Sequence, residues 1–335
     1  MTIRLALLVL ALLSAGACNK TNHPQPVNPR ASEEVRELLD FLYDTRGKQI
    51  LTGQHNYSRT KTTLTQSTDS VKAITGQTPV IWGSDFGGWH NRDTMIREAI
   101  RQHENGHIIT LMWHAGCPVD TMPGDVNPVR YMVSDEEWKA IVTPGTRFHK
   151  RLLEQYDQVA EDLKVLRDKD IPVLWRPYHE MNGIWFWWGN QPGEEGFAAL
   201  WNLMYDHFTK KHRLDNLVWV WNANAPRDWE DDEAYDYHLF YPGDHVVDIL
   251  AADVYKKDYK QSHHDDLQEL AGEKLIALGE IGIAPDPETL DTQSNWSWFM
   301  MWANWPWKYN TPRAMQDLYE HRSVINFDEY RSTRD

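Results

Sequence analysis

The sequence predicts a single α/β domain folded as a (β/α)8 TIM barrel, and three observations support this prediction. The chain has 335 residues, which fits one barrel of the usual size together with a leader. Short apolar runs alternate with amphipathic segments, which is typical of βα units in a parallel sheet. Eight such runs can be counted, and eight parallel strands close into a barrel.

The predicted strands lie at 49–53, 80–83, 107–113, 172–176, 217–221, 247–252, 275–279 and 298–302. The clearest intervening helices are expected at 93–103, 148–167, 196–210, 265–271 and 312–321. An earlier helix should begin after Ser32, a typical N-cap that precedes two glutamates and leucines at helical spacing. Two long loops, 115–146 and 223–245, follow the third and fifth strands. Long loops on this side of a barrel usually shape a cleft.

The start of the chain predicts export. Residues 1–17 combine Arg4, an apolar run that is too short to span a bilayer, and small residues before Cys18. We expect a lipoprotein signal peptide at 1–17, a polar proline-containing tether at 18–31, and the barrel at 32–335. An acylated Cys18 would anchor the protein to a bacterial outer membrane, at the cell surface or in the periplasm. The alternative is an ordinary secreted protein in which Cys18 is incidental.

Composition limits the partners. The formal net charge of −15 argues against a nucleic-acid partner and against acidic polymers, so a neutral polymer fits better. No glycine-rich phosphate loop follows a strand, and no HExxH or CxxC spacing occurs, so neither a cofactor nor a metal is expected. We expect a monomer that meets a membrane only through the lipid.

The segment 175–189, WRPYHEMNGIWFWWG, carries the clearest chemical signal. Glu180 falls where the fourth strand ends, on the loop side where side chains from several strands can converge on a ligand. The segment also contains the candidate substrate-binding residues Arg176, His179, Asn182, Trp185 and Trp188. The polar ones can donate hydrogen bonds to sugar hydroxyls, and the rings offer flat apolar faces. Taken singly each could be ordinary core, but together they suit a carbohydrate.

A second carboxylate, Glu280, ends the seventh strand in LIALGEIG. Strands four and seven stand across the pore of such a barrel, so the two carboxylates can approach the roughly 5 to 5.5 Å separation that a retaining glycosidase needs. Two acids in different surroundings can take opposite roles. Apolar rings should raise the pKa of Glu180, while Arg176 and Tyr255 are candidates to keep Glu280 ionised.

These motifs resemble glycoside hydrolase family 26, a group dominated by β-mannanases, in which Arg-Pro-x-His-Glu-x-Asn-Gly and Trp-Phe-Trp-Trp-Gly surround the acid/base glutamate. The resemblance implies that 32–335 is a retaining glycoside hydrolase domain acting on mannan, galactomannan or glucomannan. It implies that Glu180 is the acid/base and Glu280 the nucleophile.

The same resemblance assigns further substrate contacts. Tyr255 corresponds to the residue that hydrogen-bonds the nucleophile, and Trp113 and His114 to a pair at the cleavage point. His179 would hydrogen-bond the sugar next to the cleaved bond. Independently of the resemblance, Trp302 lies at the end of the eighth predicted strand, where it could form an apolar platform under a sugar ring. Mannanases often carry Asn-Pro shortly after the Trp-His pair, whereas this chain has Cys117 before proline.

Other interpretations stay open at this point. A member of the same family could cleave β-1,3-xylan or mixed-linkage β-glucan. His55, His114 and His179 could converge as in a metal-dependent hydrolase barrel, and a surface lipoprotein on an inactive barrel could only bind carbohydrate. Gln54 and Asp85, with His55, lie on the same rim as further candidate contacts.

Overall fold

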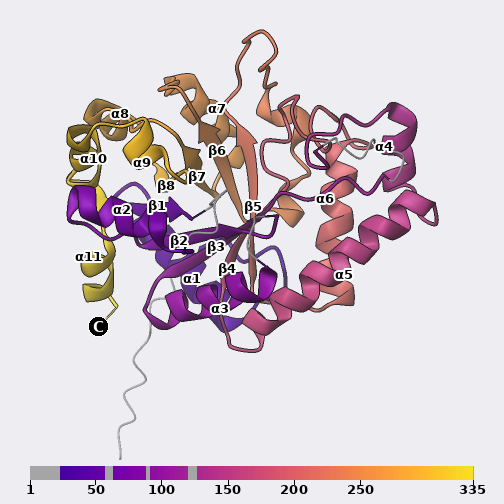
Figure 1. Ribbon diagram of the computed structural model, residues 1–335, viewed down its shortest axis with the longest axis horizontal. Helices are drawn as coiled ribbons and strands as arrows, with labels where there is room; N and C mark the ends of the chain where they lie inside the picture. The colour runs from indigo at the N-terminus through magenta and orange to yellow at the C-terminus, as the bar shows by residue number, and fades with distance from the viewer. Residues whose placement is uncertain (1–22, 57–62, 88–90, 120–126, 335) are drawn as a thin grey trace, which may run out of the picture.

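The computed structural model describes residues 23–56, 63–87, 91–119 and 127–334, and it contains the predicted barrel (Figure 1). All eight predicted strands are present, followed by a short ninth: β1 (Ile50–His55), β2 (Ile81–Asp85), β3 (Ile108–Trp113), β4 (Val173–Pro177), β5 (Leu217–Asn224), β6 (Ile249–Val254), β7 (Leu275–Ile281), β8 (Trp296–Met301) and β9 (Val324–Ile325). Within the described residues, no helix is long and apolar enough to cross a membrane.

The helices are α1 (Glu33–Thr45), α2 (Gln66–Thr75), α3 (Arg92–Glu104), α4 (Asp135–Val142), α5 (Arg147–Arg167), α6 (Phe197–Asp206), α7 (Gln261–Ala271), α8 (Pro287–Thr292), α9 (Trp305–Lys308), α10 (Pro312–Tyr319) and α11 (Phe327–Ser332). Short helical turns occur at η1 (His207–Lys211), η2 (Tyr237–Phe240) and η3 (Asp244–Val246). Ser32 caps α1 as predicted, because its side chain accepts from the amide of Val35.

Two helices differ from those expected. The helix α2 was not predicted, because half of its ten residues are serine, threonine or aspartate, which favour helices weakly. The helix expected at 196–210 is divided in two: α6 ends at Asp206, and the chain continues in η1, a π-helical turn.

The sheet closes on itself. Neighbouring strands follow the order β2-β3-β4-β5-β6-β7-β8-β1, β1 also pairs with β2, and every pairing is parallel. The strand β9 adds a parallel pair at the start of β1. In Figure 1, α2, α10 and α11 lie on one side of the strands, and α4, α5 and α6 on the other. Because all strands run the same way, their carboxyl ends share one face of the barrel.

The core has two layers, which follow from the alternation of side chains along each strand. One cluster fills the barrel and includes Leu174, Val218, Ile249, Ala277 and Met300. The other lies between the strands and the surrounding helices and is rich in tryptophan. The filled interior leaves the strand ends as the place for a binding site.

The described part of the expected tether, residues 23–31, lies against the barrel. The amide of Val27 donates to the Asp248 carboxylate at 2.7 Å, and the side-chain amide of Asn28 donates to the carbonyl of Leu214 at 3.0 Å. Asp248 and Leu214 precede β6 and β5, so this contact is at the amino-terminal face of the barrel. The sequence predicts a free spacer as far as residue 31, whereas Val27 and Asn28 are hydrogen-bonded to the barrel. The signal peptide and Cys18 lie outside the described residues.

Candidate active site

A cleft of about 990 Å³ opens at the carboxyl ends of the strands. Its walls include seven of the residues that the sequence singles out: His114, His179, Glu180, Trp185, Tyr255, Glu280 and Trp302. The strands and their following loops therefore bring both predicted carboxylates to one cavity, although 100 positions separate them in the sequence.

Glu180 faces the cleft because the chain changes direction after β4. Tyr178 and Glu180 both have a left-handed backbone, with φ of 50° and 55°, and the amide of Glu180 donates to the carbonyl of Asn222 at 2.7 Å. Tyr178 turns outward and donates to the hydroxyl of Tyr156 at 3.2 Å, while Glu180 stays over the barrel. Such a conformation costs on the order of 1–3 kcal/mol per non-glycine residue and is often found at functional sites.

Both carboxylate oxygens of Glu180 accept hydrogen bonds from neutral groups. The indole nitrogen of Trp185 donates to Oε2 at 2.7 Å, and the amide nitrogen of Asn224 donates to Oε1 at 2.8 Å. Burial, together with the negative charge of Glu280, raises the pKa of Glu180 to about 7, although both donors lower it. Glu180 can therefore hold a proton near neutral pH, as the sequence analysis predicted.

A bulge turns Glu280 toward the same cleft. Leu275 and Ala277 face the barrel interior, so strict alternation would place position 279 inside and Glu280 outside. The register against β6 shifts here, from Ala252 opposite Leu278 to Asp253 opposite Glu280. The skipped residue is Gly279, and a β-carbon there would lie 1.6 Å from Asn222 Oδ1. Bulges beside active sites commonly redirect a side chain in this way.

Glu280 is held by a cation and a phenol. The guanidinium of Arg176 donates to Oε1 at 2.8 Å, and the hydroxyl of Tyr255 donates to Oε2 at 2.5 Å. Glu280 and Arg176 are both 2% exposed. Because a buried guanidinium stabilises a negative charge, this arrangement suits a carboxylate that reacts in its charged form.

Two histidines lie between the carboxylates and β3. His114 contacts Asp85 through Nδ1 at 2.8 Å, and its amide donates to the same carboxylate at 3.0 Å. Burial alone would lower the pKa of the His114 imidazole. The negative charge of Asp85 outweighs the effect of burial, so this pKa is raised. His179 lies edge-on to His114, with ring centroids 4.6 Å apart, and its Nε2 is 3.8 Å from Glu280 Oε1. Burial lowers the pKa of His179 well below its usual range, so this imidazole is neutral at pH 7.

Aromatic rings form part of the remaining walls. Trp302 stacks on His55, with centroids 4.5 Å apart, and Trp185 lies directly over Gly183, where a β-carbon would meet the ring at 2.3 Å. Phe186 also lines the cleft, although the sequence analysis did not single it out as a contact. Sugar rings present flat C–H faces that pack on such surfaces.

Four predicted substrate contacts lie below the cleft surface instead of lining it: Trp113, Arg176, Asn182 and Trp188. All four are at most 2% exposed. Asn182 donates to the carbonyls of Asn224 and Tyr235, and Trp188 donates to the carbonyl of His179. These side chains support the site from behind: Arg176 holds Glu280, and Asn182 and Trp188 fix the backbone around the cleft. The further candidates Gln54 and His55 are also buried, and Asp85 serves His114.

Two residues beside Glu180 were not predicted from the sequence. Asn224 ends β5 and donates to the carboxylate, and Arg227 donates to Asn224 Oδ1 at 2.5 Å. The guanidinium of Arg227 also lies 4.9 Å from the centre of the Trp185 ring. Arg227 therefore contacts both donors to Glu180. The two asparagines Asn222 and Asn224 at the end of a buried strand were the signal that could have revealed Asn224.

The metal-dependent alternative required three histidines to converge. Among the described residues, His55, His114 and His179 do not form a group of ligand atoms close enough to share an ion. His179 does approach Glu180 and Asp253, with one ligand atom of each within 4.8 Å of the others. Both oxygens of Glu180 accept hydrogen bonds from neutral donors, and burial raises the pKa of this carboxyl to about 7. The geometry favours proton transfer by this carboxyl.

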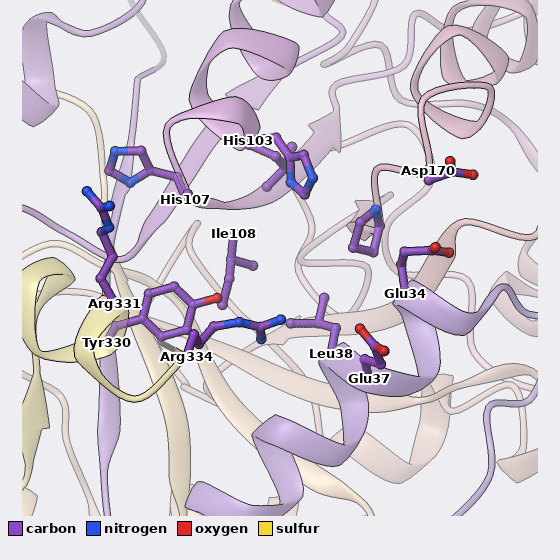
Figure 2. Close-up of a pocket in the computed structure, with 13 residues that line it drawn as sticks. Glu34, Glu37, Leu38, His103, His107, Ile108, Asp170, Tyr330, Arg331 and Arg334 are labelled. Atoms are coloured by element: carbon purple, nitrogen blue, oxygen red, sulfur yellow. The ribbon is translucent and has the colours of Figure 1, made fainter.

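A second, smaller pocket of about 350 Å³ lies at the opposite end of the barrel (Figure 2). Figure 2 shows Glu34 and Glu37 of α1 on one side of it, and Tyr330 and Arg334 on another. In this fold the amino-terminal face serves stability, whereas the carboxyl-terminal face carries the active site. The position of this pocket gives it no part in the chemistry of the two carboxylates.

Two buried carboxylates with unlike neighbours, set at the carboxyl ends of β4 and β7 beneath aromatic walls, define the class of (β/α)8 barrels that process carbohydrates. Residues 27–329 match the family described as glycosyl hydrolase family 26. The chain belongs to this family.

Several relatives and solved structures are similar to the chain. The structure of GH26A from Muricauda sp. MAR_2010_75 has 46% sequence identity and a TM-score of 0.85, and the match covers 90% of this chain and 99% of that one. A mannan endo-1,4-beta-mannosidase of Thermothelomyces thermophilus is 33% identical over 92% of this chain, and one of Bacillus subtilis is 29% identical over 88%.

The share of the relatives' own length differs. The match covers 64% of the T. thermophilus protein and 83% of the B. subtilis protein. It covers 50% and 54% of two mannan endo-1,4-beta-mannosidases from Piromyces sp.

Proposed function

We propose that this chain is a retaining β-mannanase that hydrolyses β-1,4-mannosidic bonds in mannan, galactomannan or glucomannan. The observation that carries the proposal is the pair Glu180 and Glu280, which share one cleft in opposite electrostatic surroundings. The names of the similar relatives favour mannan over other polysaccharides and favour cleavage within the chain.

In the first step, Glu180 gives its proton to the glycosidic oxygen while Glu280 attacks the anomeric carbon. The bond from that carbon to the leaving oxygen breaks, and a covalent glycosyl-enzyme forms. Glu180, now a carboxylate, takes a proton from water, and the water oxygen attacks the same carbon and releases Glu280. Two inversions at one carbon retain the β configuration.

The surrounding residues support these steps. A pKa of about 7 lets Glu180 be protonated before the first step and accept a proton in the second. Arg176 and Tyr255 fix both oxygens of Glu280 and stabilise its charge. His114 and the neutral His179 are placed to bind hydroxyls of the sugar at the cleavage point.

The test is to incubate the purified protein with mannan, galactomannan, glucomannan, xylan, cellulose and mixed-linkage glucan, and to identify the products. We expect manno-oligosaccharides, formed far faster than other products and unchanged by a chelator. A preference for β-1,3-xylan or mixed-linkage glucan would keep the chemistry and change the substrate. Activity that needs a metal would favour the metal-dependent hydrolase. No product on any substrate, with retained binding, would favour a carbohydrate-binding protein.

We also propose that the mature protein is a monomeric lipoprotein that begins at an acylated Cys18 and lies on the outer membrane. The support is the leader at 1–17 with small residues before Cys18. Expressed in a bacterial host, the wild type should partition with membranes, and Cys18→Ser should release or mislocalise it. A Cys18→Ser protein that stays membrane-bound after correct leader removal would contradict this. Light scattering of the mature domain tests the monomer.

A further inference from the structure

A cluster of one carboxylate and two imidazoles lies on the outer helical layer, away from the cleft. Asp157 comes from α5, His207 begins η1, and His212 follows it. The Nε2 atoms of His207 and His212 lie 2.7 Å and 2.6 Å from Asp157 Oδ1, and all three ligand atoms are within 4.8 Å of one another. None of these residues lines the cleft.

The π-helical turn explains why the two histidines meet. In an α-helix, residues five apart point about 140° away from each other, since each residue turns the helix by about 100°. Here the amide of His212 donates to the carbonyl of His207 at 3.1 Å, an i to i+5 bond that brings both side chains to one face. Their ring centroids are 5.2 Å apart. Such π turns are rare and occur often at functional sites.

We propose that Asp157, His207 and His212 form a binding site for a divalent transition-metal ion of the zinc type. Imidazole nitrogens and a carboxylate oxygen are the ligands that zinc takes in many proteins. Tetrahedral bonds of about 2.0–2.1 Å set ligand atoms about 3.3–3.4 Å apart, so each imidazole nitrogen would move less than about 1 Å away from Asp157 Oδ1 around an ion.

The exposure of the three side chains fits the same site. The histidine side chains are 8% and 7% exposed and thus fixed by packing, whereas Asp157 is 41% exposed and leaves a path for the ion and for water as a fourth ligand. Glu161 Oε1 lies 3.7 Å from the other ring nitrogen of His212, which adds a second negative charge beside the cluster.

Lys211 is the competitor for the ion. Its ammonium group lies 2.7 Å and 2.9 Å from the two oxygens of Asp157 and 3.5 Å from His207 Nε2. The cluster therefore already attracts a cation to this place, and an entering ion has to displace the lysine. A site that serves only as a surface ion pair would need Lys211, whereas a metal site should bind more tightly without it.

The bound ion would link α5 to the turn after α6, which pack side by side in the outer layer (Figure 1). Binding to the folded state alone raises stability with ion concentration. The cluster is outside the cleft, so hydrolysis should not change while the thermal midpoint does.

The experiment uses the tag-free mature protein after removal of metals. Calorimetric titration with Zn²⁺ should show one site, and Co²⁺ should give the visible absorption of a tetrahedral complex. His207→Asn and His212→Asn should each weaken Zn²⁺ binding by about tenfold or more. Lys211→Met should strengthen it. His238→Asn, which removes an exposed histidine elsewhere, is the control and should change neither.

The outcomes separate the two accounts of the cluster. Zn²⁺ that raises the thermal midpoint of the wild type and of Lys211→Met, but not of His212→Asn, supports the site. Absence of saturable binding in both wild type and Lys211→Met would overturn it, and so would equal binding by His212→Asn. These readouts do not involve hydrolysis, so they stand whatever the substrate proves to be.

Discussion

The two walls of the cleft hold chemically identical side chains in different ways. On the wall formed by β4 and β5, Glu180 receives its hydrogen bonds from an indole and an amide, both neutral. On the opposite wall, Glu280 receives one from the guanidinium of Arg176 and one from the phenol of Tyr255. Both carboxylates accept two side-chain hydrogen bonds and both are buried, so the number of donors does not distinguish them.

The charge of the donors does distinguish them. Neutral donors offset only part of the cost of burying a carboxylate, and the pKa of Glu180 stays raised. A guanidinium in direct contact compensates a buried negative charge much more strongly. One wall therefore suits a group that gives and takes a proton, and the other suits a group that attacks as an anion. Variants of each wall can test this division.

The largest effect is expected from Glu280→Ala. Without the nucleophile no glycosyl-enzyme can form, so activity should fall on every substrate, however good its leaving group. Loss of a nucleophile in another hydrolase class costs on the order of 10⁶-fold in kcat. Initial rates on mannan and on an aryl mannoside measure it. Glu273→Ala, an exposed glutamate before the same strand, is the control and should remain active. Retained activity of Glu280→Ala on the aryl mannoside would contradict the assignment.

Glu180→Ala should lose activity selectively. Protonation of the leaving oxygen is typically worth about 10²- to 10⁴-fold, and a loss of that size is expected on mannan. An aryl mannoside with an acidic leaving group needs no proton, so its covalent intermediate should still form and then stall.

Azide tests which wall holds which role. It needs no base, so it should speed turnover of Glu180→Ala and give the β-mannosyl azide, whereas direct attack in Glu280→Ala gives the α-anomer. The α product from Glu180→Ala would show that the two roles are reversed.

The sequence was sufficient to predict the barrel and to expect both carboxylates at its carboxyl face, because each depends on local patterns. Eight apolar runs predict eight strands, and an acid directly after such a run must lie at the carboxyl face. Whether a side chain then faces the cleft depends on one or two backbone angles. The positive φ of Glu180 and the bulge at Gly279 determine the direction in which each carboxylate points. Neither feature of the backbone follows from hydrophobic periodicity.

The contacts that lie below the cleft surface have the same cause. Trp185 and Trp188 look equivalent in the sequence, yet Trp185 reaches Glu180 while Trp188 is fully buried. The indole of Trp188 donates to the carbonyl of His179, which holds this ring in the core. Asn224 and Arg227 come from a different βα unit, and their contacts with Glu180 and Trp185 depend on the spacing of strands four and five.

A smaller effect is expected from Tyr255→Phe, which removes the neutral donor to Glu280 and leaves Arg176 in place. A hydrogen bond to a charged group is worth about 1.5–3 kcal/mol, so kcat/KM should fall by about 10- to 100-fold. Tyr259→Phe is a matched control, because the hydroxyl of this partly buried tyrosine donates to the carbonyl of Ile283 and not to a carboxylate. Equal losses in both variants would mean that the effect of Tyr255 is structural.

The smallest effect is a shift of the pH profile. A general acid must be protonated, so kcat/KM of the wild type should fall as pH rises through about 7, the pKa of Glu180. The indole of Trp185 donates to the carboxylate and lowers this pKa, so Trp185→Phe should move the alkaline limb to higher pH. A hydrogen bond of about 1 kcal/mol corresponds to about 0.7 of a pH unit.

The control for this shift is Trp229→Phe. Trp229 packs on the guanidinium of Arg227 at the same 4.9 Å as Trp185 does, but it does not donate to Glu180. It should therefore leave the alkaline limb in place, even if it alters KM through Arg227. The alkaline limb of Trp185→Phe is expected to move to higher pH although the protein has lost a contact. The reason is that this hydrogen bond stabilises only the charged form of Glu180. A downward shift would mean that the indole stabilises the protonated acid instead, and that the neutral donors on this wall do not act as the comparison with Glu280 requires.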